Sequence, residues 1–120
     1  MKVINLTPHD INICREDREI ILTFPRCQDS LKLVRASVTR KTTGTVNIDG
    51  FDIDVNVTEF GNINYVPEKI SDTIYIVSEI AASAINQVDS TRDDIFIVDD
   101  IIRDNEGKIK GCRALARRVN

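Results

Sequence analysis

The chain has 120 residues, a net charge of −3 at neutral pH, 42% apolar residues and only 5% aromatic residues. This size and composition predict one domain, residues 1–120, with a modest aliphatic core. The acidic balance excludes general nucleic-acid binding, which needs basic charge over a whole face, and no run of about 18 apolar residues is present to span a membrane.

Residues 1–65 are predicted to be strands of an N-terminal antiparallel sheet. Short apolar or alternating segments lie at 3–6, 11–13, 19–24 and 31–40. Strands at 45–48 and 51–57 flank Asp49-Gly50, a dipeptide that favours a type I′ turn. Along the second of these strands alternation predicts a solvated face opposite a buried one, the buried face formed by Phe51, Ile53, Val55 and Val57.

Residues 66–90 are predicted to form a strand at 73–77 and a helix from Glu79 to about Gln87, capped by Ser78. Helical spacing puts four apolar side chains on its inner face: Ile80, Ala81, Ala84 and Ile85. Residues 91–120 return to β structure, with a strand at 94–98 and a terminal β-hairpin. The expected fold class is therefore α+β, mostly β, with one or two short helices in the middle.

The terminal hairpin concentrates positive charge. It runs from 101–103 through a turn at 104–107 into 108–115. Residues 103–118 hold six Lys or Arg against one Asp and one Glu, so this ribbon carries +4 and the rest of the chain −7. A local basic ribbon on an acidic protein suits a small anion, most commonly a phosphate.

Arg113 is the most unusual residue of this ribbon. Alternation places it on one strand face with Ile109, Gly111 and Leu115. If that face is buried, the guanidinium needs either a bound anion or an ion pair with Asp94, Asp99 or Asp100. Gly111 leaves a gap that a ligand or another backbone can enter. Arg117 and Arg118 can also be read as a frayed basic tail.

No set of residues has the spacing of a catalytic site. His9 follows Pro8 in a turn, where it either contacts a ligand, acts as a general base or orients the turn. Cys112 lies beside Arg113, which could lower a thiol pKa, but a buried structural role is favoured. The aspartates around the Asp49-Gly50 turn (Asp49, Asp52 and Asp54) indicate a solvated strand face rather than a metal site.

The three cysteines are scattered, without a Cys-x-x-Cys motif, and His9 has no obvious metal partner nearby. This pattern favours reduced thiols over a structural zinc site. The N-terminal segment has a strand-like pattern rather than that of a signal peptide. We therefore expect a cytoplasmic protein.

An ordered set of motifs resembles small proteins common in phages and prophages. It opens with Val3-Ile-Asn-Leu-Thr-Pro-His-Asp-Ile-Asn-Ile13 and covers nearly the whole chain. Its further parts are Gly44–Val46 with Asp49-Gly50, Thr58–Gly61, Val66-Pro67, Thr73–Ser78 with the alanine-rich helix, Thr91–Asp94, Arg103–Gly107 and Gly111–Arg113. Within this group the chain resembles the first family of Thoeris anti-defence proteins.

That resemblance implies a non-enzymatic phage protein, without a cofactor, that sequesters cyclic ADP-ribose isomers made by bacterial TIR-domain defence proteins, or cyclic oligonucleotides. It implies an N-terminal sheet, two short helices, a C-terminal sheet and a homo-oligomer built from dimers. The ligand would lie between subunits, held by C-terminal arginines, an aromatic residue and an asparagine. Arg113 best matches the arginine, followed by Arg103, Arg117 and Arg92. Phe96 is the aromatic candidate, and the asparagine role falls to Asn86, Asn105 or a substituted Asp99.

The sequence thus predicts a sponge for a cyclic nucleotide immune signal, with no DNA, RNA or membrane partner, acting in the host cytoplasm if phage-encoded. Two rival functions stay open. One is an accessory protein that binds a host protein through an exposed strand edge, with no nucleotide ligand. The other is a small hydrolase or ring-opening enzyme that acts on the same nucleotides with His9 as the base.

Overall fold

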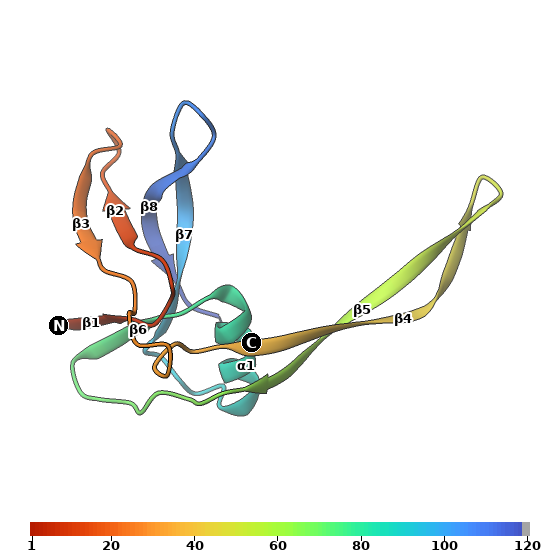
Figure 1. The fold of residues 1–120 in the computed structure, drawn as a ribbon, viewed down its shortest axis with the longest axis horizontal. Helices are drawn as coiled ribbons and strands as arrows, with labels where there is room; N and C mark the ends of the chain where they lie inside the picture. The colour runs from red at the N-terminus through yellow and green to blue at the C-terminus, as the bar shows by residue number, and fades with distance from the viewer. Residues whose placement is uncertain (119–120) are drawn as a thin grey trace.

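The protein combines one mixed β-sheet, one helix and one long β-hairpin that projects from them (Figure 1). The computed structural model describes residues 1–118, apart from the side chain of Phe60. Its elements are β1 (Lys2–Asn5), β2 (Ile11–Cys14), β3 (Ile20–Phe24), β4 (Ala36–Ile48), β5 (Phe51–Ile63), β6 (Thr73–Ile76), α1 (Glu79–Val88), β7 (Ile95–Arg103) and β8 (Ile109–Ala116). The predicted fold class, α+β and mostly β with a C-terminal hairpin, is confirmed. Within the described part of the chain, no helix has the length and apolarity to cross a bilayer.

The six-stranded sheet has the order β1-β6-β7-β8-β2-β3. The β2–β3 and β7–β8 pairs are antiparallel hairpins, whereas β1 pairs with β6, β6 with β7, and β2 with β8 in parallel. The predicted N-terminal sheet is therefore divided: β4 and β5 pair only with each other, whereas β1, β2 and β3 join the larger sheet. They add to both ends of a sheet whose centre comes from the second half of the chain.

Gly111 explains how β2 comes to lie beside β8. A Cβ atom at this position would stand 2.6 Å from the Asn12 carbonyl oxygen and 2.8 Å from the Cys14 sulfur. Only glycine lets the two strands approach this closely. Of the two occupants that the sequence allowed for this gap, a ligand or another backbone, the backbone of β2 is the one present.

The core lies between α1, β6, β7 and the base of the long hairpin. The Ser78 hydroxyl accepts a hydrogen bond from the Ala81 N–H (3.2 Å) and caps α1, as predicted. The buried side of the helix consists of small residues and one isoleucine: Ala81, Ala82, Ala84 and Ile85. The prediction that Ile80 belongs to this side is wrong, because it lies at the edge of the stripe and is exposed.

The long hairpin, which we call the arm, consists of β4 and β5. The two strands pair from Ala36 opposite Ile63 to Ile48 opposite Phe51, much farther than predicted. Asp49 (φ 51°) and Gly50 (φ 89°) form the predicted tight turn. The arm extends far from the sheet (Figure 1), which raises the radius of gyration to 17.4 Å, against about 14 Å for a compact chain of this length.

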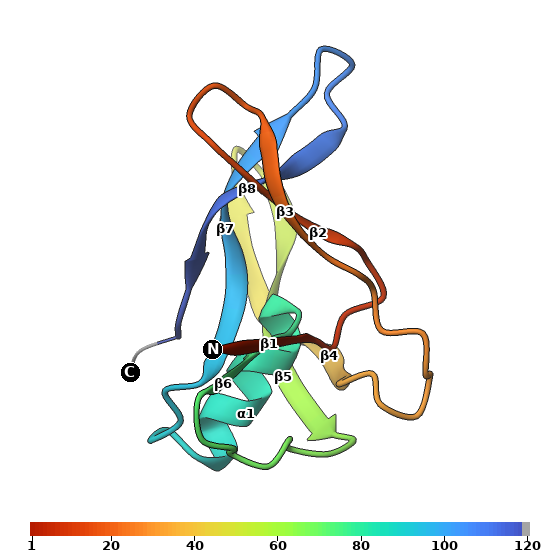
Figure 2. The same cartoon turned by 90° about the vertical axis from the view of Figure 1, so that its left-hand side faces the viewer.

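The apolar face of the arm is exposed, so the prediction that it is buried is wrong. Phe51 is 71% exposed, and Ile53, Val55 and Val57 between 43% and 47%. The alternation itself is as predicted, because these side chains share one face and the polar residues share the other. The face is exposed because the arm projects beyond the sheet and α1 (Figure 1), so no other described element covers it. In the view turned by 90° the arm points away from the viewer, behind the sheet (Figure 2).

Candidate ligand-binding site

The residues assigned to ligand binding do not converge on one place. Arg103, Asp99 and Arg113 belong to the β7–β8 hairpin, whereas Asn86 lies on α1 and Arg92 in the loop that follows it. Arg117 is exposed just beyond the end of β8. A single ligand bound to one copy of the chain therefore cannot use the whole set.

Arg113 lies exposed on β8, next to the turn between β2 and β3. Its guanidinium forms two long ion pairs, with Glu16 (Nη2 to Oε1, 3.5 Å) and with Asp100 (Nε to Oδ2, 3.7 Å). Asp100 was one of the three acidic partners expected from the sequence. Exposed pairs of this length contribute little stability, so the guanidinium can exchange them for the oxygens of an anion.

Arg103 closes the turn of its own hairpin. Its Nη1 donates a hydrogen bond to the carbonyl oxygen of Gly107 (3.0 Å). The same turn is held by the Asp104 carboxylate, which accepts from the N–H groups of Glu106 and Lys108 (2.9 and 3.0 Å). This geometry gives Arg103 a structural task at the tip of the basic ribbon.

Arg92 is held inside the protein by Asp94. Its Nε and Nη2 donate to the two carboxylate oxygens at 2.8 Å, and the two side chains are only 10% and 5% exposed. The hydrogen bond to Asp94 raises the pKa of Arg92 further above its ordinary value. The space that Arg92 lines together with Asn86 has a volume of about 10 Å³, too small for a nucleotide.

Phe96 and Asp99 occupy neighbouring parts of β7. Phe96 is half-buried and its carbonyl oxygen accepts from the Val77 N–H (2.9 Å), which joins β7 to the end of β6. Asp99 is exposed and pairs in register with Ala114. Neither residue lines the larger hollows described next.

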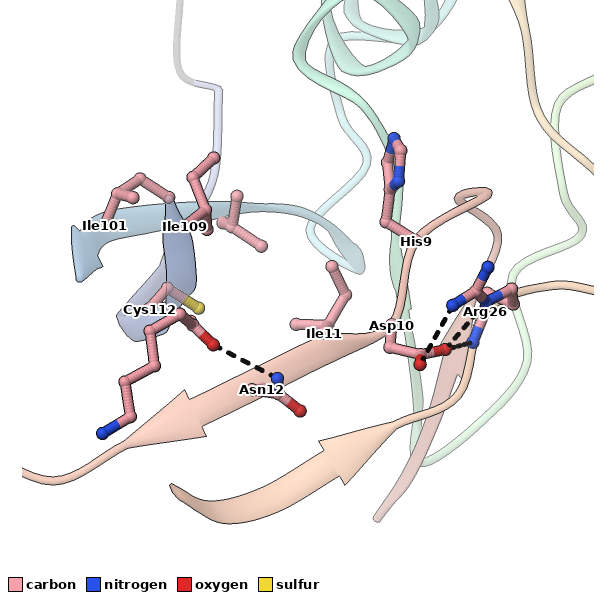
Figure 3. A pocket seen from close by; sticks show the side chains of 11 residues that line it. His9, Asp10, Ile11, Asn12, Arg26, Ile101, Ile109 and Cys112 are labelled. Carbon is pink, nitrogen blue, oxygen red and sulfur yellow. Dashed lines mark hydrogen bonds and ion pairs between the residues drawn. The ribbon is translucent and has the colours of Figure 1, made fainter. Parts of the chain in front are cut away.

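A hollow of about 430 Å³ opens between β2 and the β7–β8 hairpin (Figure 3). Much of its wall is aliphatic and comes from all three strands: Ile11, Val98, Ile101 and Ile109. Polar groups are contributed by His9, Asp10, Asn12, Arg26 and Lys110. An apolar wall with a few cationic groups is the composition expected of a small-molecule site.

The hollow is bordered on one side by an ion pair between Asp10 and Arg26 (Figure 3). The Arg26 guanidinium meets both carboxylate oxygens (3.2 and 3.3 Å), and its backbone N–H donates to Oδ1 (2.8 Å). These hydrogen bonds lower the pKa of the Asp10 carboxyl, which stays ionised at neutral pH. Lys110, by contrast, also lines the hollow and has no ion pair among the described residues.

His9 is placed at the hollow by a hydrogen-bonded turn. The buried Asn5 side chain donates to the carbonyl oxygens of His9 (2.8 Å) and Phe24 (3.0 Å), and its Oδ1 accepts from the Thr7 N–H and hydroxyl (2.9 and 2.7 Å). The turn is thus organised through the backbone of His9. Its exposed side chain is left to line this hollow and an adjoining one of about 460 Å³ beside α1.

The thiol that lines the hollow is not activated as a nucleophile. Cys112 is almost fully buried, and burial raises the pKa of its thiol, so the depressed pKa considered from its neighbour Arg113 is wrong. Within the described chain, no three His, Cys, Asp or Glu side chains are grouped as metal ligands.

Sequence reasoning considered His9 as a ligand contact and Gly111 as a gap for a ligand, but it did not bring the residues of this hollow together. Asp10 and Arg26 are sixteen positions apart, and Ile11 meets Ile109 only because β2 lies beside β8. Two sequence features pointed to these strands: Gly111, and the alternation of Ile11 and Ile13 with polar residues. Neither feature indicates which strand pairs with which. Scans against models of known families, curated proteins and solved structures each found no match to this chain.

Proposed function

We propose that this protein binds a cyclic nucleotide immune signal and holds it without converting it, as an anti-defence sponge. The observation that carries the proposal is the hollow beside β2, β7 and β8. Its volume of about 430 Å³ is within the range of nucleotide-sized sites. The motif resemblance supplies the ligand class, a cyclic ADP-ribose isomer or a cyclic oligonucleotide.

The lining chemistry supports this ligand class. An adenine ring would rest against the aliphatic wall formed by Ile11, Ile101 and Ile109. The phosphates would meet the basic ribbon, through Lys110, which lines the hollow, and through Arg113, which lines a separate depression beside the turn between β2 and β3. The resemblance places the ligand between subunits, which would let the two cations come from different copies.

The direct test is to purify the protein from cells that make the signal, denature it by heat and analyse what is released. An intact cyclic nucleotide supports a sponge, whereas a ring-opened product indicates an enzyme. Release of no nucleotide, together with no binding in calorimetry to cyclic ADP-ribose isomers and cyclic di- and trinucleotides, would refute the proposal. The accessory-protein function, which the exposed apolar face of the arm favours, would then be preferred.

Arg113→Ala should weaken nucleotide binding about thirtyfold or more while the protein stays folded. The reason is the loss of a charge-assisted contact to phosphate. Calorimetric titration measures the affinity and a melting curve the stability. Lys108→Ala is the matched control, because it removes one charge from the same ribbon in an exposed ion pair. If Arg113→Ala bound the nucleotide like the wild type and Lys110→Ala did not, the phosphate contact would be assigned to Lys110 at the hollow and not to Arg113.

Affinity for the nucleotide should also fall as ionic strength rises, because the phosphate contacts on the basic ribbon are partly Coulombic. Titrations between about 0.05 and 0.5 M salt measure this dependence. An affinity that does not change over that range would show that the base and ribose, rather than the phosphates, provide the binding energy.

A further inference from the structure

The hollow beside α1, which we call the α1 hollow, adjoins the one beside β2, β7 and β8, which we call the first hollow. Their volumes are similar, about 460 and about 430 Å³, and three residues line both: His9, Ile11 and Val98. The His9 side chain points away from the Asp10–Arg26 pair that borders the first hollow (Figure 3). A ligand larger than one hollow can therefore extend past His9 into the other.

The α1 hollow lies at the carboxyl ends of parallel strands. β6, α1 and β7 form a β-α-β unit, because β7 pairs with β6 in parallel after the helix, and β1 pairs with β6 on its other side. The segments that follow β1 and β6, Thr7–His9 and Val77–Glu79, both line the hollow. Sheets with parallel strands usually bind their ligands in this position.

The walls of the α1 hollow are mostly apolar. Its floor is formed by three core side chains that are 4% exposed or less: Val34, Ile76 and Val77. Ile80, on the first turn of α1, stands at the rim and is 43% exposed. An apolar floor of this size with an open rim is typical of a small-molecule site.

The two hollows differ in charge. The first is lined by Lys110 and Arg26 against Asp10, a net charge of +1, whereas the charges of Arg35 and Glu79 in the α1 hollow cancel. The first residue of α1 is itself acidic, so this helix end does not require an anion. Phosphates are therefore favoured in the first hollow and an uncharged group in the α1 hollow.

We propose that the α1 hollow is the second half of the ligand site and holds an uncharged, ribose-bearing unit of the same ligand, while the phosphates stay in the first hollow. Ile80 then determines specificity, because its side chain contacts that unit at the rim. This inference rests on the proposed function, since it requires a nucleotide that spans both hollows. A nucleotide with a single nucleoside unit, such as AMP, would occupy the first hollow alone.

The first test measures affinity after a substitution at the rim. Ile80→Gln removes an apolar contact without adding a charge. Calorimetry with cyclic ADP-ribose and cyclic di-AMP should give an affinity about tenfold lower for whichever of them binds the wild type, and an unchanged affinity for AMP. Val88→Gln is the matched control, because Val88 is an exposed residue at the far end of α1 and lines neither hollow, so this protein should bind like the wild type.

Two outcomes of this comparison would overturn the inference. One is an Ile80→Gln protein that binds the cyclic nucleotide like the wild type. The other is a loss of affinity that is equally large for AMP, which would mean that the substitution disturbs the first hollow. A wild type that binds neither cyclic nucleotide would refute the proposed function, and this inference with it.

The second test locates the ligand by fluorescence. The chain has no tryptophan, so Ile80→Trp and Val88→Trp each place a single reporter on α1. A saturating cyclic nucleotide should quench and shift the emission of Ile80→Trp and leave that of Val88→Trp unchanged. An Ile80→Trp protein that binds AMP but no longer binds the cyclic nucleotide would also support the inference, because the larger side chain then fills the α1 hollow. If calorimetry showed the cyclic nucleotide bound to Ile80→Trp without any change in emission, the ligand would lie in the first hollow alone, and the inference would be overturned while the proposed function stood.

Discussion

Gly111→Ala should lower the free energy of unfolding by about 3 kcal/mol, which is the upper part of the range for overpacking a well-packed position. The new Cβ would stand 2.6 Å from the Asn12 carbonyl oxygen, and this atom belongs to the backbone of β2 and cannot rotate away. The alternative is for β2 to move, which would loosen its single in-register pairing with β8, Ile13 opposite Cys112. Urea unfolding followed by circular dichroism measures the loss.

Gly44→Ala is the matched control for this substitution. Gly44 also lies in a strand, but a Cβ there would have nothing within 4 Å. Its substitution should change the unfolding free energy by no more than about 0.5 kcal/mol, the usual range for a surface position. If Gly111→Ala were as stable as Gly44→Ala, β2 would not lie against β8, and the wall of the hollow would have to be assigned again.

The features that the sequence predicted correctly have local causes. Asp49-Gly50 makes a tight turn because both positions need positive φ, and Ser78 begins α1 because its hydroxyl accepts from the Ala81 N–H. Each of these outcomes is determined by residues within three or four positions. The terminal hairpin belongs to the same class, since Asp104 and Gly107 lie within one turn.

The pairing of distant strands could not be predicted in the same way. Strand periodicity says that one face of β5 is apolar but not what covers it, and here nothing in the described chain does. The parallel pairing of β2 with β8 joins segments about a hundred residues apart, and a pattern within either strand is compatible with several partners. The hollow depends on this pairing, so its residues could not be grouped into one site from the sequence, although His9 and Gly111 were singled out separately.

The partners of charged residues were only partly accessible from the sequence. Asp100 was named in advance as a partner for Arg113, because both lie on the terminal hairpin. Arg92 was instead assigned to a ligand by motif, although Asp94 is only two positions away and takes both edges of its guanidinium. A motif shows where a basic residue lies in the sequence. Whether that residue is available for a ligand depends on its burial and on its ion-pair partners in the fold.

Arg92→Ala should destabilise the protein by about 3–5 kcal/mol, the cost of leaving one member of a buried ion pair without its partner. Asp94 is 5% exposed, and its carboxylate would lose both 2.8 Å hydrogen bonds. Replacing both residues with apolar ones, Arg92→Met together with Asp94→Leu, should recover most of the loss because no buried charge remains. Thermal and urea unfolding of the three proteins measure these differences.

Lys69→Ala is the control for this pair, because it breaks the ion pair between Lys69 and Asp93 (2.7 Å), whose side chains are more than half exposed. Solvent screens that pair, so its loss should leave the unfolding midpoint nearly unchanged. The comparison separates a structural role of Arg92 from a ligand-binding one. An Arg92→Ala protein that unfolds like the wild type but no longer binds nucleotide would return Arg92 to the ligand site, and it would require the Arg92–Asp94 pair to open when the ligand binds.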